Sequence, residues 1–116
     1  MDWGTIECEP EITGWLRKLD DNAANRVGFY IDLLAERGPL LDEPYTRQLH
    51  GKLRELRFWL ADQPTRISYW IASGRRIILL TVWTKTRMRE TAEVERARRA
   101  MQRCQNERHI VDEEEW

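Results

Sequence analysis

The strongest constraint on the fold is a series of three apolar segments in the middle of the chain, separated by short turn signals. In residues 53–60 and 66–71, apolar and polar side chains alternate with the period of a strand that buries one face. Residues 77–83 form a continuous apolar run rich in β-branched residues, typical of a strand covered on both faces. Because Asp62-Gln63-Pro64 and Ser73-Gly74 favour tight turns, we expect an antiparallel meander.

Helical periodicity flanks this meander on both sides. Residues 3–9 alternate weakly and predict a first strand added to the meander, and two helical segments follow, the second ending at Gly38-Pro39. The apolar stripes are Ile12, Trp15, Leu16 and Leu19 in the first helix, and Val27, Tyr30, Ile31 and Leu34 in the second. A further stripe in residues 88–105 comprises Val94, Ala97, Met101 and Cys104. The predicted order is β-α-α-β-β-β-α, an α+β fold with an antiparallel sheet, an N-terminal helical hairpin and a C-terminal helix.

Length and composition limit the class of protein. A chain of 116 residues with 41% hydrophobic residues predicts one domain, residues 1–108, followed by a frayed acidic tail, residues 109–116. Two cysteines cannot form a disulfide framework, and the first residues lack the layout of a secretory signal, so we expect a cytoplasmic protein. No apolar run approaches the ~20 residues that span a bilayer. These features argue against a multidomain enzyme, a secreted mini-protein and a membrane protein.

The charges are segregated along the chain. Residues 1–46 carry ten acidic and four basic side chains, residues 47–108 carry fifteen basic and six acidic ones, and residues 109–116 carry four acids. Sixteen of the nineteen basic residues are arginine, which favours planar recognition of phosphate or carboxylate. This pattern predicts a surface that binds nucleic acid or an acidic protein, although a mixed solvated surface is the simpler alternative.

Several common types of catalytic site have no counterpart in the sequence. There is no glycine-rich phosphate loop, no Cys or His pair at metal-ligand spacing and no nucleophile-elbow motif, so we expect no metal and no cofactor. His50, which precedes the first meander strand, suits either proton transfer near neutral pH or a single structural hydrogen bond.

Cations on the predicted strands are the main candidates for a site. Arg57 and Arg66 lie on strands expected to pair, so their side chains can converge on a phosphodiester; otherwise such residues solvate an open face or pair with Glu55. The other strand and turn cations are Lys52, Arg54, Arg76 and Lys85. The neighbouring aromatic residues are Trp59, Tyr69, Trp70 and Trp83. They either stack on RNA bases or belong to the core, and Trp83 and Tyr69 are the first candidates for the core. A basic stripe on the last helix, suited to RNA, an acidic partner or water, comprises Arg89, Arg96, Arg99 and Arg103.

These segments resemble the RelE/HigB-type toxins. Residues 48–57, QLHGKLRELR, are similar to the family's L-x-G-x-L-x-E-L-R segment, and residues 66–69 are similar to its R-I-x-Y strand. Residues 77–85 resemble the hydrophobic strand that precedes F-x-K, with Trp83 in place of Phe, and residues 93–98 resemble part of the closing helix. The resemblance extends from residue 3 to about residue 104 and implies the same β-α-α-β-β-β-α fold.

The resemblance implies a toxin of a type II toxin–antitoxin system that cleaves mRNA on the ribosome without a metal, by attack of the RNA 2′-hydroxyl. Arg57 and Arg66 would then hold the scissile phosphate, Lys85 would assist, and His50 would transfer a proton. Thr86 replaces a common second Lys of the family, for which Arg87 and Arg89 would substitute.

Two other functions stay open. One is that of a ParE-like toxin that binds DNA gyrase without nuclease activity, and the other is a nucleic-acid-binding domain without catalysis. The expected partners are an antitoxin of helix-turn-helix type, the ribosome and mRNA. We expect no association with a membrane. We expect the antitoxin to cover the cationic groove or to hold the basic last helix away from RNA.

Overall fold

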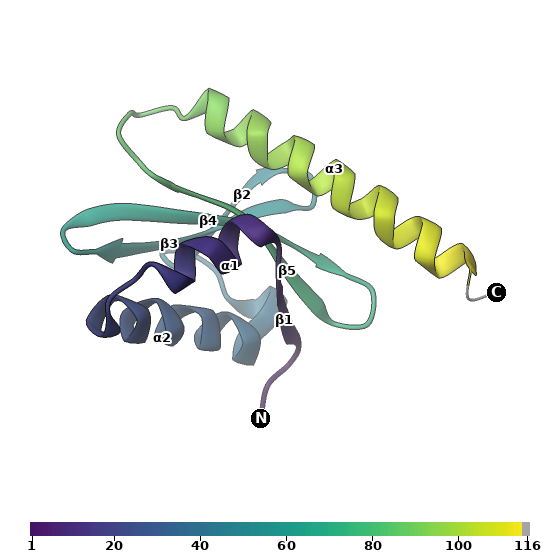
Figure 1. Ribbon diagram of the computed structural model, residues 1–116, viewed down its shortest axis with the longest axis horizontal. Coiled ribbons are helices and arrows are strands. Elements are labelled where there is room, and N and C mark those ends of the chain that lie inside the picture. Colours follow the sequence, from purple (N-terminus) through teal and green to yellow (C-terminus); the bar gives the residue numbers. More distant parts are fainter. Residues whose placement is uncertain (115–116) are drawn as a thin grey trace.

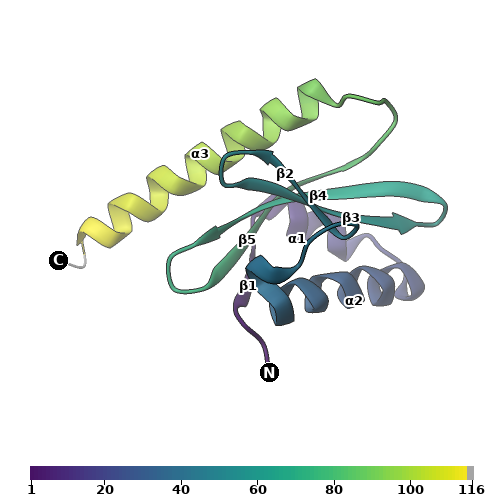
Figure 2. The ribbon, with the colours of Figure 1, turned by 180° about the vertical axis from the view of Figure 1, so that it is seen from behind.

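The computed structural model is an α+β fold in which helices cover both faces of one five-stranded sheet (Figures 1 and 2). It describes the backbone of residues 1–114 and the side chains of residues 1–107. The strands are β1 (Thr5–Cys8), β2 (Thr46–His50), β3 (Leu53–Leu60), β4 (Gln63–Ala72) and β5 (Arg76–Thr84). The helices are α1 (Pro10–Arg17), α2 (Asp21–Arg37), a short 3-10 turn η1 (Gly38–Leu40) and α3 (Thr91–Glu114).

The predicted fold class is confirmed, and the sheet differs from the expectation in two details. Its order is β1-β5-β4-β3-β2, and β1 runs parallel to β5, so the sheet is mixed rather than wholly antiparallel. The sequence prediction also missed β2, which is short, mostly exposed and pairs only with β3. The turn predicted at residues 62–64 lies instead at Ala61 and Asp62, which both have positive φ. It lies earlier than predicted because β4 already begins at Gln63.

The helical hairpin forms where the sequence signals place it. Pro10 occupies the first turn of α1, where its missing N–H costs no hydrogen bond. The Asp20 side chain caps α2 by accepting a hydrogen bond from the Ala23 N–H at 2.8 Å. Gly38 ends α2 with φ of 51°, and a Cβ there would lie 2.3 Å from the Trp3 ring, so this position requires glycine.

The sheet separates two hydrophobic cores. On one face, α1 and α2 pack over Leu56, Ile67, Tyr69, Ile77 and Leu79. On the other face, α3 packs Ala97, Ala100, Met101 and Cys104 over Leu53, Trp70, Ala72, Ile78 and Leu80. The predicted stripe of the last helix is therefore confirmed from Ala97 onward, whereas Val94 is only half-buried.

Helix α3 begins later and extends further than the periodicity predicted. It starts at Thr91 rather than residue 88, because residues 85–90 form a loop, and its backbone stays helical to Glu114. The tail predicted to be frayed, residues 109–116, is thus helical in its backbone as far as Glu114, and residues 115–116 lie outside the described residues. The separation of this tail from the domain stays a prediction. No helix within the described part of the chain is long and apolar enough to cross a membrane.

Candidate nucleic-acid interface

A groove opens between the sheet and the first turns of α3. Its volume is about 400 Å³, and its walls come from β2 to β5, the loop of residues 85–90 and the start of α3. The ionisable side chains that line it are Arg47, His50, Glu55, Arg66, Lys85, Arg89, Glu90, Glu95 and Arg98. The groove exists because α3 packs closely on the sheet only from Ala97 onward, so that its first turns stand above the polar end of the strands.

Two β-bulges aim side chains into this groove. In β5 the register with β4 shifts between Ser68 and Tyr69, so that Leu80 is an extra residue and the alternation of the strand is reversed beyond it. Trp83 therefore lies opposite Arg66 on the α3 side of the sheet, and Lys85 follows on the same side. A second register shift, between Gln48 and His50 in β2, likewise places His50 at the groove.

Glu55 lies at the floor of the groove among cations. Its side chain is buried, with the residue only 7% exposed, and its Oε2 atom lies 3.6 Å from Arg57 Nε and 3.7 Å from Arg66 Nε. Burial raises the pKa of the Glu55 carboxyl above its usual value, although the charges of Arg66, Arg57, Lys85 and Arg47 act in the opposite direction. A carboxylate with a raised pKa and neighbouring cations has the properties of a proton acceptor.

Arg57 and Arg66 occupy directly paired positions on β3 and β4, as the predicted convergence requires. Arg66 is 8% exposed, and its Nη1 donates to the Thr65 carbonyl at 3.1 Å. Burial and the charge of Arg57 lower the pKa of Arg66, and Glu55 opposes them. Among the described residues, no hydrogen-bond acceptor pairs with the buried Arg57 Nε. The Arg57 side chain is 25% exposed and the Arg66 side chain 9%, so the pair presents positive charge to an anion mainly through Arg57.

The loop between β5 and α3 carries Lys85 and Arg89 at the groove. The Lys85 backbone N–H donates to the Pro64 carbonyl at 2.7 Å, which anchors the start of the loop to β4. The Glu90 carboxylate then accepts the backbone N–H groups of Thr86 at 2.6 Å and Arg87 at 2.8 Å. These two backbone hydrogen bonds lower the pKa of Glu90. The loop thus has a defined conformation in front of α3.

Several predicted RNA-binding residues do not line this groove. Arg54 lies on the opposite face of the sheet, where it donates to Thr46 Oγ1 at 3.0 Å and to the Tyr69 hydroxyl at 3.4 Å. Arg76 is at the far end of β5, bonded to the Ser73 carbonyl and 3.9 Å from Glu7. Arg57 lines a neighbouring hollow rather than the groove itself. The remaining predicted cations outside the groove lining are Lys52, Arg87, Arg96, Arg99 and Arg103.

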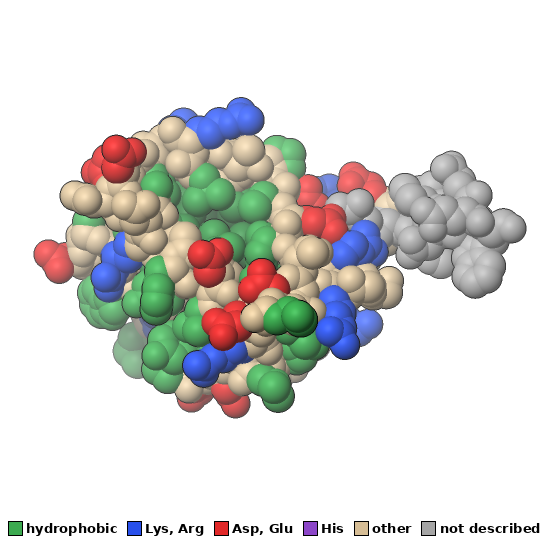
Figure 3. Space-filling view, turned by 90° about the horizontal axis from the view of Figure 1, so that it is seen from below, with side chains coloured by type: hydrophobic (Ala, Val, Ile, Leu, Met, Phe, Trp, Pro, Cys, Tyr) green, Lys and Arg blue, Asp and Glu red, His purple; other side chains and the backbone are tan. Residues whose placement is uncertain are grey.

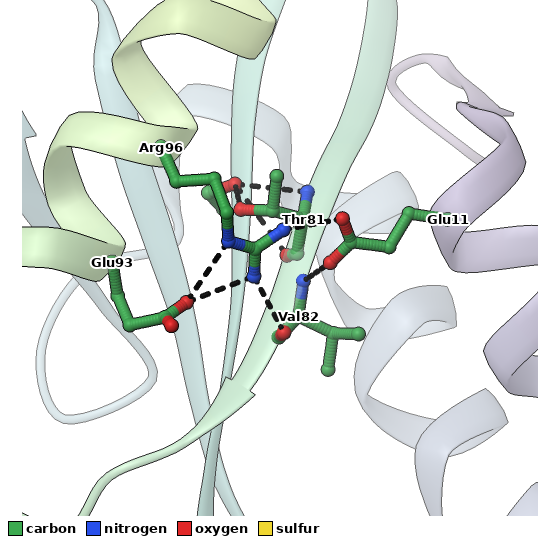
Figure 4. Close-up of polar contacts among 6 residues, drawn as sticks. Glu11, Thr81, Val82, Glu93 and Arg96 are labelled. Carbon is green, nitrogen blue, oxygen red and sulfur yellow. Dashed lines mark hydrogen bonds and ion pairs between the residues drawn. The ribbon is translucent and has the colours of Figure 1, made fainter.

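Arg96 instead joins three elements (Figure 4). Its guanidinium forms ion pairs with Glu11 of α1 and with Glu93 one turn earlier in α3, and Nη2 donates to the Val82 carbonyl of β5 at 3.1 Å. The Glu11 carboxylate also accepts the Val82 N–H at 2.8 Å, so the two side chains together cover the free edge of β5 beyond β1. Although burial opposes it, the hydrogen bonds and charges of Glu11 and Glu93 raise the pKa of Arg96.

The aromatic residues, for which the sequence left both a core position and base stacking open, fall into a buried group and an exposed one. Tyr69, Trp70 and Trp83 are buried, whereas Trp59 is 59% exposed. Arg47 and Arg98 were not predicted as site residues, and Glu55 was expected only as a partner of the arginines, not at the centre of the site. Within the described residues, no group of His, Cys, Asp and Glu side chains is arranged to hold a metal ion.

Comparison with known proteins identifies the family and the fold. The profile of the family described as "Phage derived protein Gp49-like (DUF891)" matches residues 14–105. Among solved structures, a double arginine-to-alanine mutant of the E. coli toxin RelE in the free state is similar, with a TM-score of 0.58 and 16% sequence identity. The match covers 89% of this chain and 98% of that chain. Among curated protein sequences, none matches the chain significantly.

Proposed function

Since the chain belongs to the Gp49-like family, a family of RelE-like toxins, we propose that it is the toxin of a type II toxin–antitoxin pair that cleaves mRNA on the ribosome. The observation that carries the cleavage step is the buried Glu55 carboxylate between Arg57 and Arg66 at the floor of an open groove. A proton acceptor beside two anion-binding groups is what cleavage of a phosphodiester by its own 2′-hydroxyl needs.

In the proposed reaction, Glu55 accepts the proton of the 2′-hydroxyl, and the 2′-oxygen attacks the adjacent phosphorus. Arg57 and Arg66 stabilise the extra negative charge on the phosphate oxygens as the P–O5′ bond breaks. His50 or Lys85, both at the groove, protonates the departing 5′-oxygen. The products are a 2′,3′-cyclic phosphate on one fragment and a 5′-hydroxyl on the other.

The proposed partners follow from this site. The ribosome would present mRNA in an extended form to the groove, in the cytoplasm. The family implies an antitoxin partner. We assign that antitoxin to the helix-turn-helix type and expect it to cover the groove, because burying the Arg57–Arg66 pair would block access of the phosphate.

The test is primer extension on a defined mRNA in a cell-free translation system, comparing wild type with Glu55→Gln and Arg57→Ala. General acid–base groups typically contribute ~10²- to 10⁴-fold, so Glu55→Gln should lose cleavage by a factor in this range. Loss of one group that stabilises developing charge typically costs ~10²- to 10³-fold, which is the loss expected for Arg57→Ala. The end groups of the fragments are determined in parallel and should be a cyclic phosphate and a 5′-hydroxyl. Arg99→Ala is the matched control, because Arg99 is an exposed cation outside the groove.

Cleavage that is equal in Glu55→Gln and wild type would contradict the assignment of Glu55. Arrested translation with intact mRNA would contradict the nuclease function altogether. Growth arrest that persists in Arg57→Ala and Arg66→Ala, together with binding to DNA gyrase, would favour the ParE-like alternative.

A further inference from the structure

A second hollow lies next to the groove, at the place where β3 extends beyond β2. Residues 58–60 of β3 pair with β4 only, because the pairing of β2 with β3 begins at Thr46 opposite Leu56 and the Arg57 N–H donates to the Tyr45 carbonyl at 2.8 Å. The hollow around this free edge has a volume of about 300 Å³. The side chains that matter for it are Tyr30, Tyr45, Phe58 and Trp59, with Arg57 and Arg66.

The aromatic side of the hollow is held in place by its own contacts. The rings of Tyr30 and Phe58 are stacked, with centroids 5.1 Å apart and planes at 13°, and the Tyr45 ring lies 6.5 Å from that of Tyr30. Arg26 Nε donates to the Trp59 carbonyl, which fixes the strand at this point. Trp59 and Tyr45 nevertheless stay 59% and 38% exposed. Exposed aromatic surface beside rings that are held in fixed positions is typical of binding sites.

The other side of the hollow is cationic and continuous with the groove. Arg66 lines both hollows, and Arg57 lines this one. The Arg57 side chain is 25% exposed, although its Nε is buried 3.6 Å from the Glu55 carboxylate. A phosphate oxygen can reach the exposed part of this side chain while the attached nucleoside lies toward the rings.

We propose that this aromatic hollow stacks the base of a nucleotide that flanks the cleaved phosphate. The inference rests on the proposed nuclease function and adds a base-binding subsite to it. Exposed rings beside arginines suit single-stranded RNA, because bases stack on the rings while phosphates pair with the cations. A volume of about 300 Å³ is at the lower end for ligand pockets and suits one base rather than a peptide helix.

The chemistry of the lining also defines what the subsite distinguishes. Besides the arginines, the polar side-chain groups of its lining are the Tyr30 and Tyr45 hydroxyls and the Trp59 indole N–H, and among the described residues no Asn, Gln, Asp or Glu lines it to read a base edge. Stacking depends on the size of the base more than on its hydrogen-bonding pattern. The subsite therefore favours purines over pyrimidines without selecting one base.

The experiment measures single-turnover cleavage on programmed ribosomes at subsaturating protein. The mRNA is either intact or carries a 1-deoxyribose spacer, which keeps the 2′-hydroxyl but lacks the base, at each nucleotide flanking the cut in turn. Trp59→Ala should slow cleavage of intact mRNA by about 5- to 150-fold, the range that corresponds to loss of one base stack. The same substitution should have little effect on the mRNA that lacks the stacked base, and Trp59→Phe should restore most of the rate.

Controls separate this inference from the nuclease proposal. Leu40→Ala removes an exposed apolar side chain outside the hollow and should leave both rates unchanged. Equal rates for Trp59→Ala and wild type on intact mRNA would overturn the subsite, and would leave the hollow to the antitoxin or the ribosome. An equal loss on intact and spacer-containing mRNA would also overturn it, because the contact would then not involve a base. No cleavage of intact mRNA by the wild type would overturn the nuclease function itself.

Discussion

At the scale of single residues, Glu55 is the position where burial and charge oppose each other most directly. Burial raises its pKa above the ordinary value of 4.5 in spite of four neighbouring cations. A carboxyl with a raised pKa in the folded state contributes stability below its unfolded pKa and loses it as pH rises through the folded value. We therefore expect the free energy of unfolding of the wild type, relative to Glu55→Gln, to decrease as pH rises from 4.5.

Urea unfolding of both proteins at fixed ionic strength and stepwise pH measures this difference. Glu36→Gln, at an exposed position of α2, is the control for the loss of one charge. A wild type that gains stability over Glu55→Gln as pH rises would mean that the cations outweigh burial.

Arg54 differs from Arg57 although the two lie on one strand. Its guanidinium bonds the buried Thr46 hydroxyl and the buried Tyr69 hydroxyl under the helical hairpin. Arg54→Met removes these bonds and should lower the free energy of unfolding by about 1–3 kcal/mol, the usual cost of leaving buried polar groups without partners. Cleavage per folded molecule should be unchanged. Denaturant unfolding and primer extension on the same preparations test this, and lost cleavage by a folded Arg54→Met would place Arg54 at the RNA.

Alternation along the strands was enough to predict that Arg57 and Arg66 meet, because the short turn between β3 and β4 fixes the register. It was not enough for Glu55. The sequence places Glu55 on the same face as Arg57, but its burial depends on two elements that local patterns left open. These are β2, which was missed, and the height of the first turns of α3 above the sheet.

At the scale of elements, the two β-bulges explain why the groove could not be read from periodicity. Residues 77–83 are an uninterrupted apolar run, so nothing in them indicates that Leu80 is an extra residue. Without that bulge, Lys85 would point to the helical hairpin instead of the groove. The existence and type of the helices and of four strands were predictable, because their patterns are local, whereas the side that each groove residue faces depends on pairing.

The Arg96 cluster is the element-scale contact that holds α3 against β5 and α1. Arg96→Ala removes the ion pairs with Glu11 and Glu93 and the hydrogen bond to the Val82 carbonyl. Because the side chain is 40% exposed, solvent weakens the ion pairs, and we expect a loss of about 1–2 kcal/mol in the free energy of unfolding. Amide hydrogen exchange should become faster in the first turns of α3. Arg99→Ala is the control, because the ion pair of Arg99 with Glu95 is 3.9 Å long, and it should change neither the free energy of unfolding nor the exchange rate. If amide exchange in Arg96→Ala were as slow as in the wild type, apolar packing alone would hold the helix.

At the scale of the molecule, folding gathers cations that the net charge of −1 conceals. The apolar part of α3 covers one end of the sheet and leaves a groove over the other end, with the buried Glu55 at its floor. The side of α2 presents a different surface, on which hydrophobic side chains are mixed with isolated acidic and basic ones (Figure 3). The segregation of charge in the sequence predicted an uneven surface, and the structure adds that the groove cations come from β2, β4, the loop before α3 and α3 itself.

This arrangement predicts how RNA binding depends on salt. A protein that binds phosphates releases counterions, and for single strands the logarithm of the binding constant falls with that of salt concentration by about 0.7 per phosphate contact. Removal of one groove cation in Lys85→Ala or Arg89→Ala should therefore reduce the slope by about 0.7 each, because both residues line the groove. Arg99→Ala should keep the wild-type slope. Binding of a 2′-O-methylated, uncleavable RNA, followed by fluorescence anisotropy over roughly 50–200 mM salt, measures the slopes. If Arg99→Ala lowered the slope as much as Lys85→Ala, the RNA would lie along the outer face of α3, and the groove would not be its binding site.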